Sequence, residues 1–396
     1  MTILDTIDSL ASSITDLAHH IHRNPELSEQ EFQTTELLRN KLAAAGIELP
    51  DVSLDTGLVA LIRGRSSGRT VALRGDMDAL PINEDPAHQI CSTRENIMHA
   101  CGHDMHTASL YGAALALQAH REEIPGNILL LFQPAEEHSK GAKDIIKCGI
   151  FERFPIEAVF AYHVWPDYPA GTVAIKAGPL MAAQKFFTVR IIGKGGHGSA
   201  PHTTHDPIVP AARIVDALQS IAARRYDPLK AFVLSICYIH AGTACNIIPE
   251  EAELGGTCRF LDAEMADIIK QWIIDICTKT ANACDCRAEV TFFNEIPPVI
   301  NDDHLTDIAW KAAEKVYGCE NVVNAKIQMG SEDFSMYAQK VPIFMFHAGY
   351  AVPEKETAPL HNRHMIVPDH VPVMAAKMLS LCAIDYLNDP CQEDQQ

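Results

Sequence analysis

A continuous apolar run of strand length constrains the fold of this chain more than any other feature of its sequence. Residues 127–132 read NILLLF, and further apolar runs occur at 59–62, 70–73, 158–162 and 343–346. Strands without polar alternation are typical of parallel sheets that are covered on both faces. Helical periodicities lie between most of these runs, so the sequence predicts an α/β fold with a mainly parallel sheet.

Two local predictions follow from the same pattern. Apolar residues recur at helical spacing from Ile3 to Ile21, which predicts a single opening helix. The run at 158–162 predicts a strand that ends at His163. Because sites in open α/β sheets lie beyond the carboxyl ends of the strands, we expect the polar residues at such ends to converge. These residues are Asp76, Asp78, Glu136, Glu137 and His163.

The order of elements changes at about Gln184. From there the sequence predicts strand, helix, strand, strand, helix and strand, which is the arrangement of a ferredoxin-like unit. The helix–strand alternation resumes after Pro297 and Pro298. We therefore predict a discontinuous first domain made of residues 1–183 and 297–396, with an inserted α+β domain at 184–296.

The charge balance narrows the possible partners. A net charge of -19, from 32 basic and 51 acidic residues, argues against nucleic acids and anionic membranes as partners, but it does not exclude a small anionic substrate. The first residues do not resemble a signal peptide, and no run approaches the ~18 apolar residues of a membrane span. The 12 cysteines follow no disulfide framework, which indicates a cytoplasmic protein with free thiols.

The densest group of metal-binding side chains lies at residues 98–108, which read MHACGHDMHTA. Thiolate and imidazole groups bind borderline transition metals well. Cys101 and His103, which are one residue apart, are predicted to be ligands, whereas His99 and His106 are predicted to be neighbours. Either of the first two residues alone would more commonly be a buried thiol or a histidine at a helix start.

Glu136 and Glu137 directly follow the apolar run at 127–132. Adjacent carboxylates can divide the work of hydrolysis, because one can bind a metal while the other moves a proton to or from the attacking water. Two solvated loop glutamates are the ordinary alternative. Likewise, His163 could be a hydrogen-bonded core histidine, and His361 could be one of several solvated loop histidines.

Several motifs occur together in the order found in one enzyme family. They are RGDMDALP at 74–81, CGH at 101–103, QPAEE at 133–137, GKGGHG at 193–198, NIIP at 246–249 and GSEDF at 330–334. Over nearly its whole length the chain resembles the M20 metallopeptidase family. The resemblance is greatest to its amidohydrolase branch of hippurate hydrolases, N-acyl-amino-acid amidohydrolases and auxin-conjugate hydrolases. It implies a zinc-exopeptidase-like catalytic domain with the inserted domain as a lid.

The resemblance also implies roles for individual residues. Glu136 would be the general acid/base beside a centre of two divalent ions, which could be zinc, manganese, nickel or cobalt. The implied metal ligands are Cys101, His103, Glu137, His163 and His361. In the lid, His197 would help to polarise the scissile carbonyl, while Asn246 and Arg259 would contact the substrate.

Asp78 is predicted either as a hydrogen-bond partner of a metal ligand or as a strand-end cap. The resemblance implies that the lid mediates a homodimer, although each lid residue taken alone could be an ordinary surface or turn residue. After His361 the chain reads Asn362-Arg363-His364, where the branch usually has a proline and an aromatic residue nearby. This departure leaves the pocket wall and the choice of substrate open.

We therefore expect a metal-dependent amidohydrolase that cleaves hippurate-like or N-acetylated amino acids into a carboxylic acid and a free amino acid. A dipeptidase or a deacetylase of N-acetylated diamino acids on the same centre is the alternative within this class. Outside it, Cys101 could be a thiol nucleophile, or the chain could be a metal-binding scaffold without activity. The intact pair of Glu136 and Glu137 speaks against the scaffold.

Overall fold

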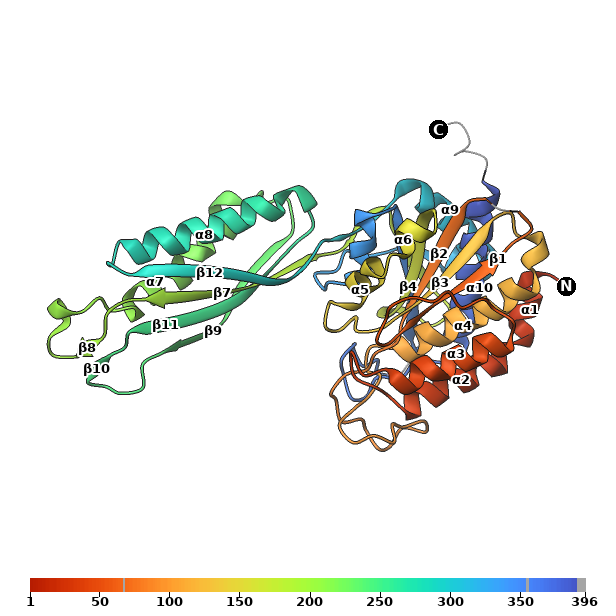
Figure 1. The fold of residues 1–396 in the computed structure, drawn as a ribbon, viewed down its shortest axis with the longest axis horizontal. Coiled ribbons are helices and arrows are strands. Elements are labelled where there is room, and N and C mark those ends of the chain that lie inside the picture. Colours follow the sequence, from red (N-terminus) through yellow and green to blue (C-terminus); the bar gives the residue numbers. More distant parts are fainter. Residues whose placement is uncertain (67, 354–355, 390–396) are drawn as a thin grey trace. The chain divides into compact units, whose positions relative to one another are not determined.

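The computed structural model describes residues 1–66, 68–353 and 356–389, which fold into two compact units (Figure 1). The first unit comprises Met1–Leu180, Ile300–Lys326 and the chain from Asp333 onward, and the second comprises Met181–Val299 with Ile327–Glu332. Sequence patterning places this last short segment in the first domain. It belongs to the second unit because the Ala182 N–H donates to the carbonyls of Gln328, at 3.0 Å, and Gly330, at 2.9 Å.

The first unit is built on a seven-stranded mixed sheet in the order β1-β3-β2-β4-β15-β5-β14. Its strands are β1 (Leu58–Arg63), β2 (Thr70–Asp76), β3 (Asn127–Gln133), β4 (Ile156–Pro169), β5 (Val173–Ile175), β14 (Val322–Asn324) and β15 (Ile343–Ala351). The central strands β3, β2, β4 and β15 are parallel. The strands β1 and β5 pair antiparallel with β3 and β15. The predicted α/β fold with a mainly parallel sheet is confirmed, and the reversed strands lie toward its edges.

The first unit also contains the α-helices that follow. They are α1 (Ile3–Ser9), α2 (Ala11–Arg23), α3 (Phe32–Ala44), α4 (His103–Ala119), α5 (Gly141–Lys147), α6 (Ile150–Arg153), α9 (Asp303–Tyr317) and α10 (His370–Asn388). The prediction of one opening helix is wrong, because the helix is interrupted at Leu10, which separates α1 from α2. Leu10 keeps a right-handed helical backbone, with φ -92° and ψ -1°, so the apolar residues stay in phase and their periodicity does not reveal the break.

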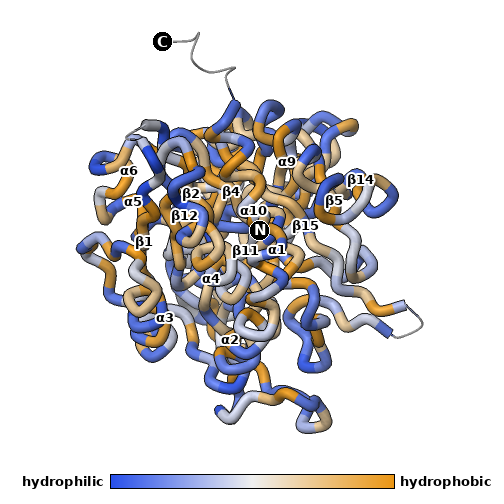
Figure 2. Tube along the Cα trace, turned by 90° about the vertical axis from the view of Figure 1, so that its right-hand side faces the viewer, coloured by the Kyte–Doolittle hydropathy of each residue, from blue (hydrophilic) through white to orange (hydrophobic). Residues whose placement is uncertain are grey.

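The helix α10 is part of the core of the first unit. Among the described helices it alone is long and apolar enough to cross a membrane, judged by length and composition only. However, 72% of its apolar window is buried inside the protein. In Figure 2 hydrophobic segments gather around β4, β15 and α10, while hydrophilic segments lie at the periphery. Core packing therefore accounts for the hydropathy of α10.

The second unit is an α+β structure with its own core. Its elements are β7 (Ala183–Ile192), α7 (Ile208–Ser220), β9 (Phe232–Ala241), β11 (Glu251–Phe260), α8 (Ala266–Asn282) and β12 (Arg287–Ile296). The four strands form an antiparallel sheet in the order β12-β7-β11-β9, and Phe187, Ile214, Leu254 and Ile273 are buried between this sheet and the helices. The predicted ferredoxin-like order of elements is thus confirmed.

Two short strand pairs lie outside the two main sheets. The strands β8 (Gly196–His197) and β10 (Ile247–Ile248) form a small antiparallel pair, and β6 (Gly178–Met181) pairs with β13 (Val299–Asn301).

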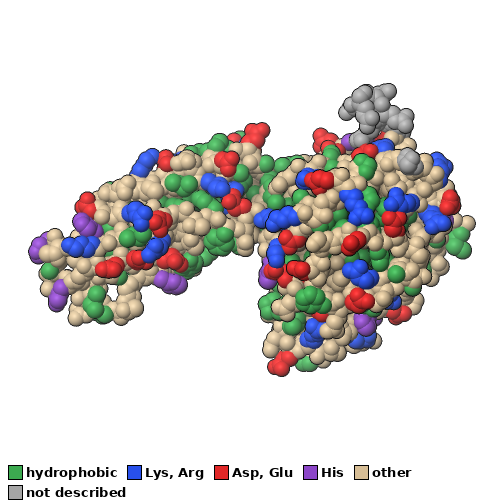
Figure 3. Space-filling view, viewed as in Figure 1, with side chains coloured by type: hydrophobic (Ala, Val, Ile, Leu, Met, Phe, Trp, Pro, Cys, Tyr) green, Lys and Arg blue, Asp and Glu red, His purple; other side chains and the backbone are tan. Residues whose placement is uncertain are grey.

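The visible surface of both units carries acidic and basic side chains in a mixed distribution (Figure 3). That face therefore offers no continuous basic surface of the kind that binds nucleic-acid backbones.

The strand β4 does not end at His163 as the sequence predicts, but continues to Pro169. It pairs in parallel with β15, and the register matches His163 with His347 and Val164 with Ala348. The ring of Trp165 stacks on that of His347 with 4.1 Å between centroids. Backbone pairing and ring stacking therefore extend the strand beyond His163.

Gly102 connects Cys101 to the first residue of α4. Its φ of +83° lies in the left-handed region, which disfavours residues with a Cβ atom. A Cβ atom here would also lie 2.5 Å from Cγ2 of Val164 on β4. Both the turn and the close approach of α4 to the sheet therefore require glycine at this position.

We predict that Gly102→Ala lowers the free energy of unfolding by about 2–4 kcal/mol, because it adds a steric clash to left-handed strain. Gly149→Ala is the matched control, since Gly149 has a φ of +82° but a Cβ atom added there would meet nothing within 4 Å. The control should lose about 1–2 kcal/mol. Chemical denaturation of both variants in chelator measures the difference, and equal losses would contradict the packing argument.

Candidate metal centre

The side chains predicted to bind metal come from four parts of the first unit. Cys101 and His103 flank Gly102 at the start of α4, His163 lies on β4, and Glu137 follows β3. His361 lies in the segment between β15 and α10, with its backbone N–H bonded to the carbonyl of Ala100 at 2.7 Å. This hydrogen bond brings a late part of the chain to the residues before α4.

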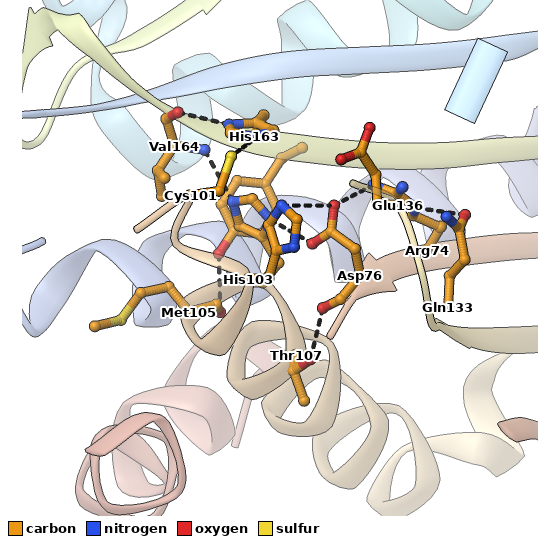
Figure 4. A network of polar contacts seen from close by, with 12 residues as sticks. Arg74, Asp76, Cys101, His103, Met105, Thr107, Gln133, Glu136, His163 and Val164 are labelled. Atoms are coloured by element: carbon orange, nitrogen blue, oxygen red, sulfur yellow. Dashed lines mark hydrogen bonds and ion pairs between the residues drawn. The ribbon is translucent and has the colours of Figure 1, made fainter. Parts of the chain in front are cut away.

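Cys101, His103 and His163 form one group of potential ligands (Figure 4). Sγ of Cys101 lies 3.4 Å from Nε2 of His163. Nδ1 of His163 donates to the carbonyl of Val164 at 2.7 Å, which leaves Nε2 as the nitrogen that faces the thiol. Burial, together with the nearby His106, holds the pKa of His163 well below 6.5. The ring is therefore neutral, as a metal ligand must be.

Glu137 joins a second group with Cys101 and His361. Its Oε1 lies 3.3 Å from Nε2 of His361 and 4.0 Å from Nε2 of His103. Among the described residues, this Oε1 and Nε2 of His103 are buried polar atoms without a hydrogen-bond partner. Burying such atoms without a partner is costly, so the pair fits a site that holds a cation between its ligands.

The charge of the site supports the same conclusion. Burial lowers the pKa of His103, but the carboxylates of Asp76, Asp78 and Glu137 overcome this effect and raise it to about 10. The negative charge of the carboxylates thus exceeds the positive charge around the His103 ring, and a proton bound to the ring balances part of it. A divalent cation would supply this positive charge directly, so the residues present fit the two ions implied by the sequence resemblance.

Asp78 contacts both parts of the ligand set. Its Oδ1 accepts from Nδ1 of His103 at 3.1 Å, and its Oδ2 accepts from the Glu137 N–H at 3.0 Å and from the Ser28 hydroxyl at 2.6 Å. The first contact fixes which imidazole nitrogen of His103 faces the other ligands. Such carboxylate–histidine pairs orient ligands in metal sites.

Asp76 is held by a buried arginine that the sequence patterns did not single out as a site residue. Nη1 of Arg74 lies 2.6 Å from Asp76, and the same guanidinium contacts Gln133 at 2.9 Å and Asp333 at 3.2 Å. The Asp333 N–H in turn lies 3.3 Å from Oε1 of Glu136 (Figure 4 shows Arg74, Asp76, Gln133 and Glu136). The only sequence signal is that these residues lie within the family motifs.

The neighbours of the ligands also have defined contacts. Nδ1 of His106 donates to Asp76 at 2.6 Å, while its Nε2 accepts from the Val164 N–H at 3.0 Å. His99 is buried, its pKa is lowered to about 4 by burial, and neither nitrogen has a hydrogen-bond partner among the described residues. His106 therefore ties α4 to β2 and β4, whereas His99 is a neutral core histidine.

His197, Asn246 and Arg259 lie in the second unit. His197 is on β8, and the Gly198 N–H donates to the carbonyl of Asn246 at 2.9 Å, so the first two residues belong to neighbouring loops. Arg259 is on β11 with its guanidinium 5.4 Å from the ring centroid of Phe186. Its Nη1 is buried and has no hydrogen-bond partner among the described residues.

Comparisons with known proteins identify the family of this chain. Residues 72–383 match the profile of Peptidase family M20/M25/M40. The chain belongs to this family. Thermostable carboxypeptidase 2 of Saccharolobus solfataricus is 39% identical over 380 residues, which is 95% of each chain. Hippurate hydrolase of Campylobacter jejuni is 36% identical over 389 residues, covering 98% of this chain and 100% of that enzyme.

A solved structure extends the comparison. A Bacillus subtilis protein, described as a dinuclear metal-binding peptidase of the M20 family, matches with a TM-score of 0.84 and 33% identity. The match covers 96% of this chain and 99% of that one. The predicted relationship to the M20 amidohydrolase branch is confirmed, and the protein is a hydrolase of amide bonds.

One charged cluster beside the centre of this M20 hydrolase gives a pH-dependent prediction. Nδ1 of His22 contacts Asp104 at 2.8 Å, and its Nε2 contacts Glu84 at 2.9 Å. Burial lowers the pKa of His22, but the two carboxylates overcome this effect and raise it to about 10. The protonated ring is therefore favoured in the folded state.

We expect this contribution of His22 to stability to be complete below pH 6.5 and to be lost as the pH rises to about 10. Unfolding free energies of the wild type and His22→Asn should thus converge over this range, by at most about 1.4 kcal/mol per pH unit. His20→Asn, at an exposed position of the same helix, should leave the wild-type profile unchanged. Parallel profiles for the wild type and His22→Asn would contradict the assignment.

Proposed function

We propose that this M20 hydrolase cleaves the amide bond of N-acyl amino acids, with water attacking the acyl carbon while the C–N bond breaks. The products are a carboxylic acid and a free amino acid. The observation that carries the proposal is the placement of Glu136 and Glu137 beside His103, with potential ligand atoms within 4.8 Å of one another. The similarity to hippurate hydrolase supports the choice of substrate class.

Cys101, His103, Glu137, His163 and His361 would hold two divalent ions. When bound, such ions polarise the scissile carbonyl and make the attacking water more acidic. The thiol and imidazole groups favour zinc, while manganese, nickel and cobalt are also compatible with this donor set. Asp78 would support the centre by orienting His103 and the backbone of Glu137, for which its hydrogen bonds at 3.1 and 3.0 Å are the evidence.

Glu136 would move the proton. Its carboxylate is mostly buried, and the Asp333 N–H lies 3.3 Å from its Oε1. In the proposed reaction this carboxylate accepts a proton from the attacking water and delivers it to the nitrogen of the leaving amine. General acid/base catalysis of this kind contributes about 10²–10⁴ to the rate.

The second unit would complete substrate recognition. His197 would polarise the scissile carbonyl, Asn246 would contact the substrate, and Arg259 would bind the carboxylate of the amino acid. The buried Nη1 of Arg259, which has no hydrogen-bond partner among the described residues, supports the assignment of Arg259 to the substrate carboxylate.

We also propose a homodimer formed through the second unit. Its edge strand β9 supports this proposal, because Val233 and Ile239 on it are exposed.

A peptidase is the second candidate function, and the similarity to thermostable carboxypeptidase 2 favours keeping it. A dipeptidase is one form of this candidate, and an N-acetyl-diamino-acid deacetylase on the same centre is kept as a further alternative. The proposed partner remains a small molecule, and a cytoplasmic location remains a prediction. Hydrolysis rates for hippurate, N-acetyl amino acids, N-acetylated diamino acids and dipeptides separate these candidates.

We predict that Glu136→Gln lowers kcat on the preferred substrate by about 10²–10⁴ while the metal content stays at the wild-type value, because the amide cannot accept the proton. Glu137→Gln is the matched comparison, since it changes the neighbouring carboxylate and should lower the metal content. Both are measured by steady-state kinetics and elemental analysis. Wild-type turnover by Glu136→Gln would refute its role.

The possibility of a thiol nucleophile is tested on the same preparation. If Cys101 binds metal, chelators should abolish the activity, whereas iodoacetamide should not affect the metal-loaded enzyme. If Cys101 is instead a nucleophile, iodoacetamide should inactivate the enzyme and chelators should not.

A further inference from the structure

A second histidine–carboxylate cluster lies in the first unit, apart from the residues proposed for catalysis. Asp85, His88 and His364 each offer one potential ligand atom, and these atoms lie within 4.8 Å of one another. Nδ1 of His364 lies 2.9 Å from Oδ2 of Asp85. The cluster joins two segments that are far apart in the sequence, and it includes one of the residues at which the chain departs from the usual pattern after His361.

Backbone hydrogen bonds hold the two segments together. The Asp85 N–H donates to the carbonyl of Arg363 at 3.2 Å, and the Arg363 guanidinium lies 3.3 Å from the carbonyl of Glu84. A tight turn places His88 beside Asp85, because the His88 N–H donates to the Asp85 carbonyl at 3.1 Å. The three side chains are therefore brought together by the fold of the main chain as well as by their own charges.

The ring of His88 is oriented as in known metal sites. Its Nδ1 lies 2.8 Å from Oε1 of Glu84, a buried carboxylate that also accepts from the Ser92 N–H at 2.6 Å and from His22 at 2.9 Å. With Nδ1 directed at Glu84, the ring leaves Nε2 as the nitrogen that could bind an ion. A carboxylate behind the ring is the usual companion of a histidine that binds metal through its other nitrogen.

We propose that Asp85, His88 and His364 bind a third divalent transition-metal ion, such as zinc, nickel, cobalt or copper. Two imidazoles and one carboxylate suit these borderline ions better than they suit magnesium or calcium. Two ligand atoms at about 2.0–2.1 Å from a tetrahedral ion are roughly 3.3 Å apart. Oδ2 of Asp85 and Nδ1 of His364, now 2.9 Å apart, would therefore separate by a few tenths of an ångström to bind it. Three protein ligands leave further positions for water.

The site is accessible from one side, and its ion would have a structural effect. The side chains of His364 and Asp85 are 57% and 27% exposed, so an ion can reach these two ligands from solvent, while His88 lies deeper with its side chain 8% exposed. His364 follows the proposed ligand His361 by three residues. An ion bound here would therefore brace the segment that carries His361 against the segment that begins at Glu84.

Metal content at equilibrium tests the proposal. The wild type, His88→Ala and His364→Ala are dialysed against one fixed concentration of free zinc, and zinc per chain is measured by elemental analysis. Each variant should hold one ion fewer than the wild type. His304→Ala is the matched control, because it removes another histidine–carboxylate pair, with Nε2 of His304 3.1 Å from Asp389, and it should bind as much zinc as the wild type.

The difference between the proteins tests this site whatever the occupancy of the catalytic centre, so it does not depend on the proposed function. Thermal unfolding provides a second measurement, because zinc should raise the Tm of the wild type more than that of His364→Ala. Equal zinc content in all four proteins would refute the site. Loss of zinc by the His304→Ala control as well would also refute it, since binding would then be nonspecific.

Discussion

The metal centre depends on two buried carboxylates, those of Asp76 at the end of β2 and of Asp78 just after it. Asp76 and Asp78 are almost fully buried, and ionised groups in such positions require nearby positive charge. Arg74 supplies it on one side of Asp76, while His103 lies between the two carboxylates and the additional charge of Glu137. The fold thus builds an acidic, largely buried site whose remaining charge two divalent ions would balance.

This charge arrangement also explains how separate parts of the chain are held in position. Asp76 binds α4 through His106, while Arg74 contacts Gln133 at the end of β3 and Asp333 in the C-terminal part of the unit. Asp78 connects the start of α4 to the backbone that follows Glu136. The same polar contacts therefore stabilise the carboxyl ends of the strands and orient the side chains proposed for hydrolysis.

Much of this could be predicted from the sequence, because the apolar runs are strong signals for buried strands and the motifs are dense in metal-binding residues. The limits have physical causes. The break at Leu10 leaves the helical phase unchanged, and the course of β4 beyond His163 depends on pairing with β15, which is distant in sequence. The partners of Arg74 likewise come from three separate segments, so no local pattern identifies it. The roles of the individual ligands remain predictions.

Metal reconstitution tests the central claim most directly. The protein is depleted with a chelator and titrated with zinc or manganese, while hydrolysis of hippurate and N-acetyl amino acids is followed together with bound metal. If the centre works as proposed, the depleted protein is inactive and hydrolysis returns as the ions bind at the centre of Cys101, His103, Glu137, His163 and His361. Full activity of the depleted protein, with no metal bound, would contradict this account.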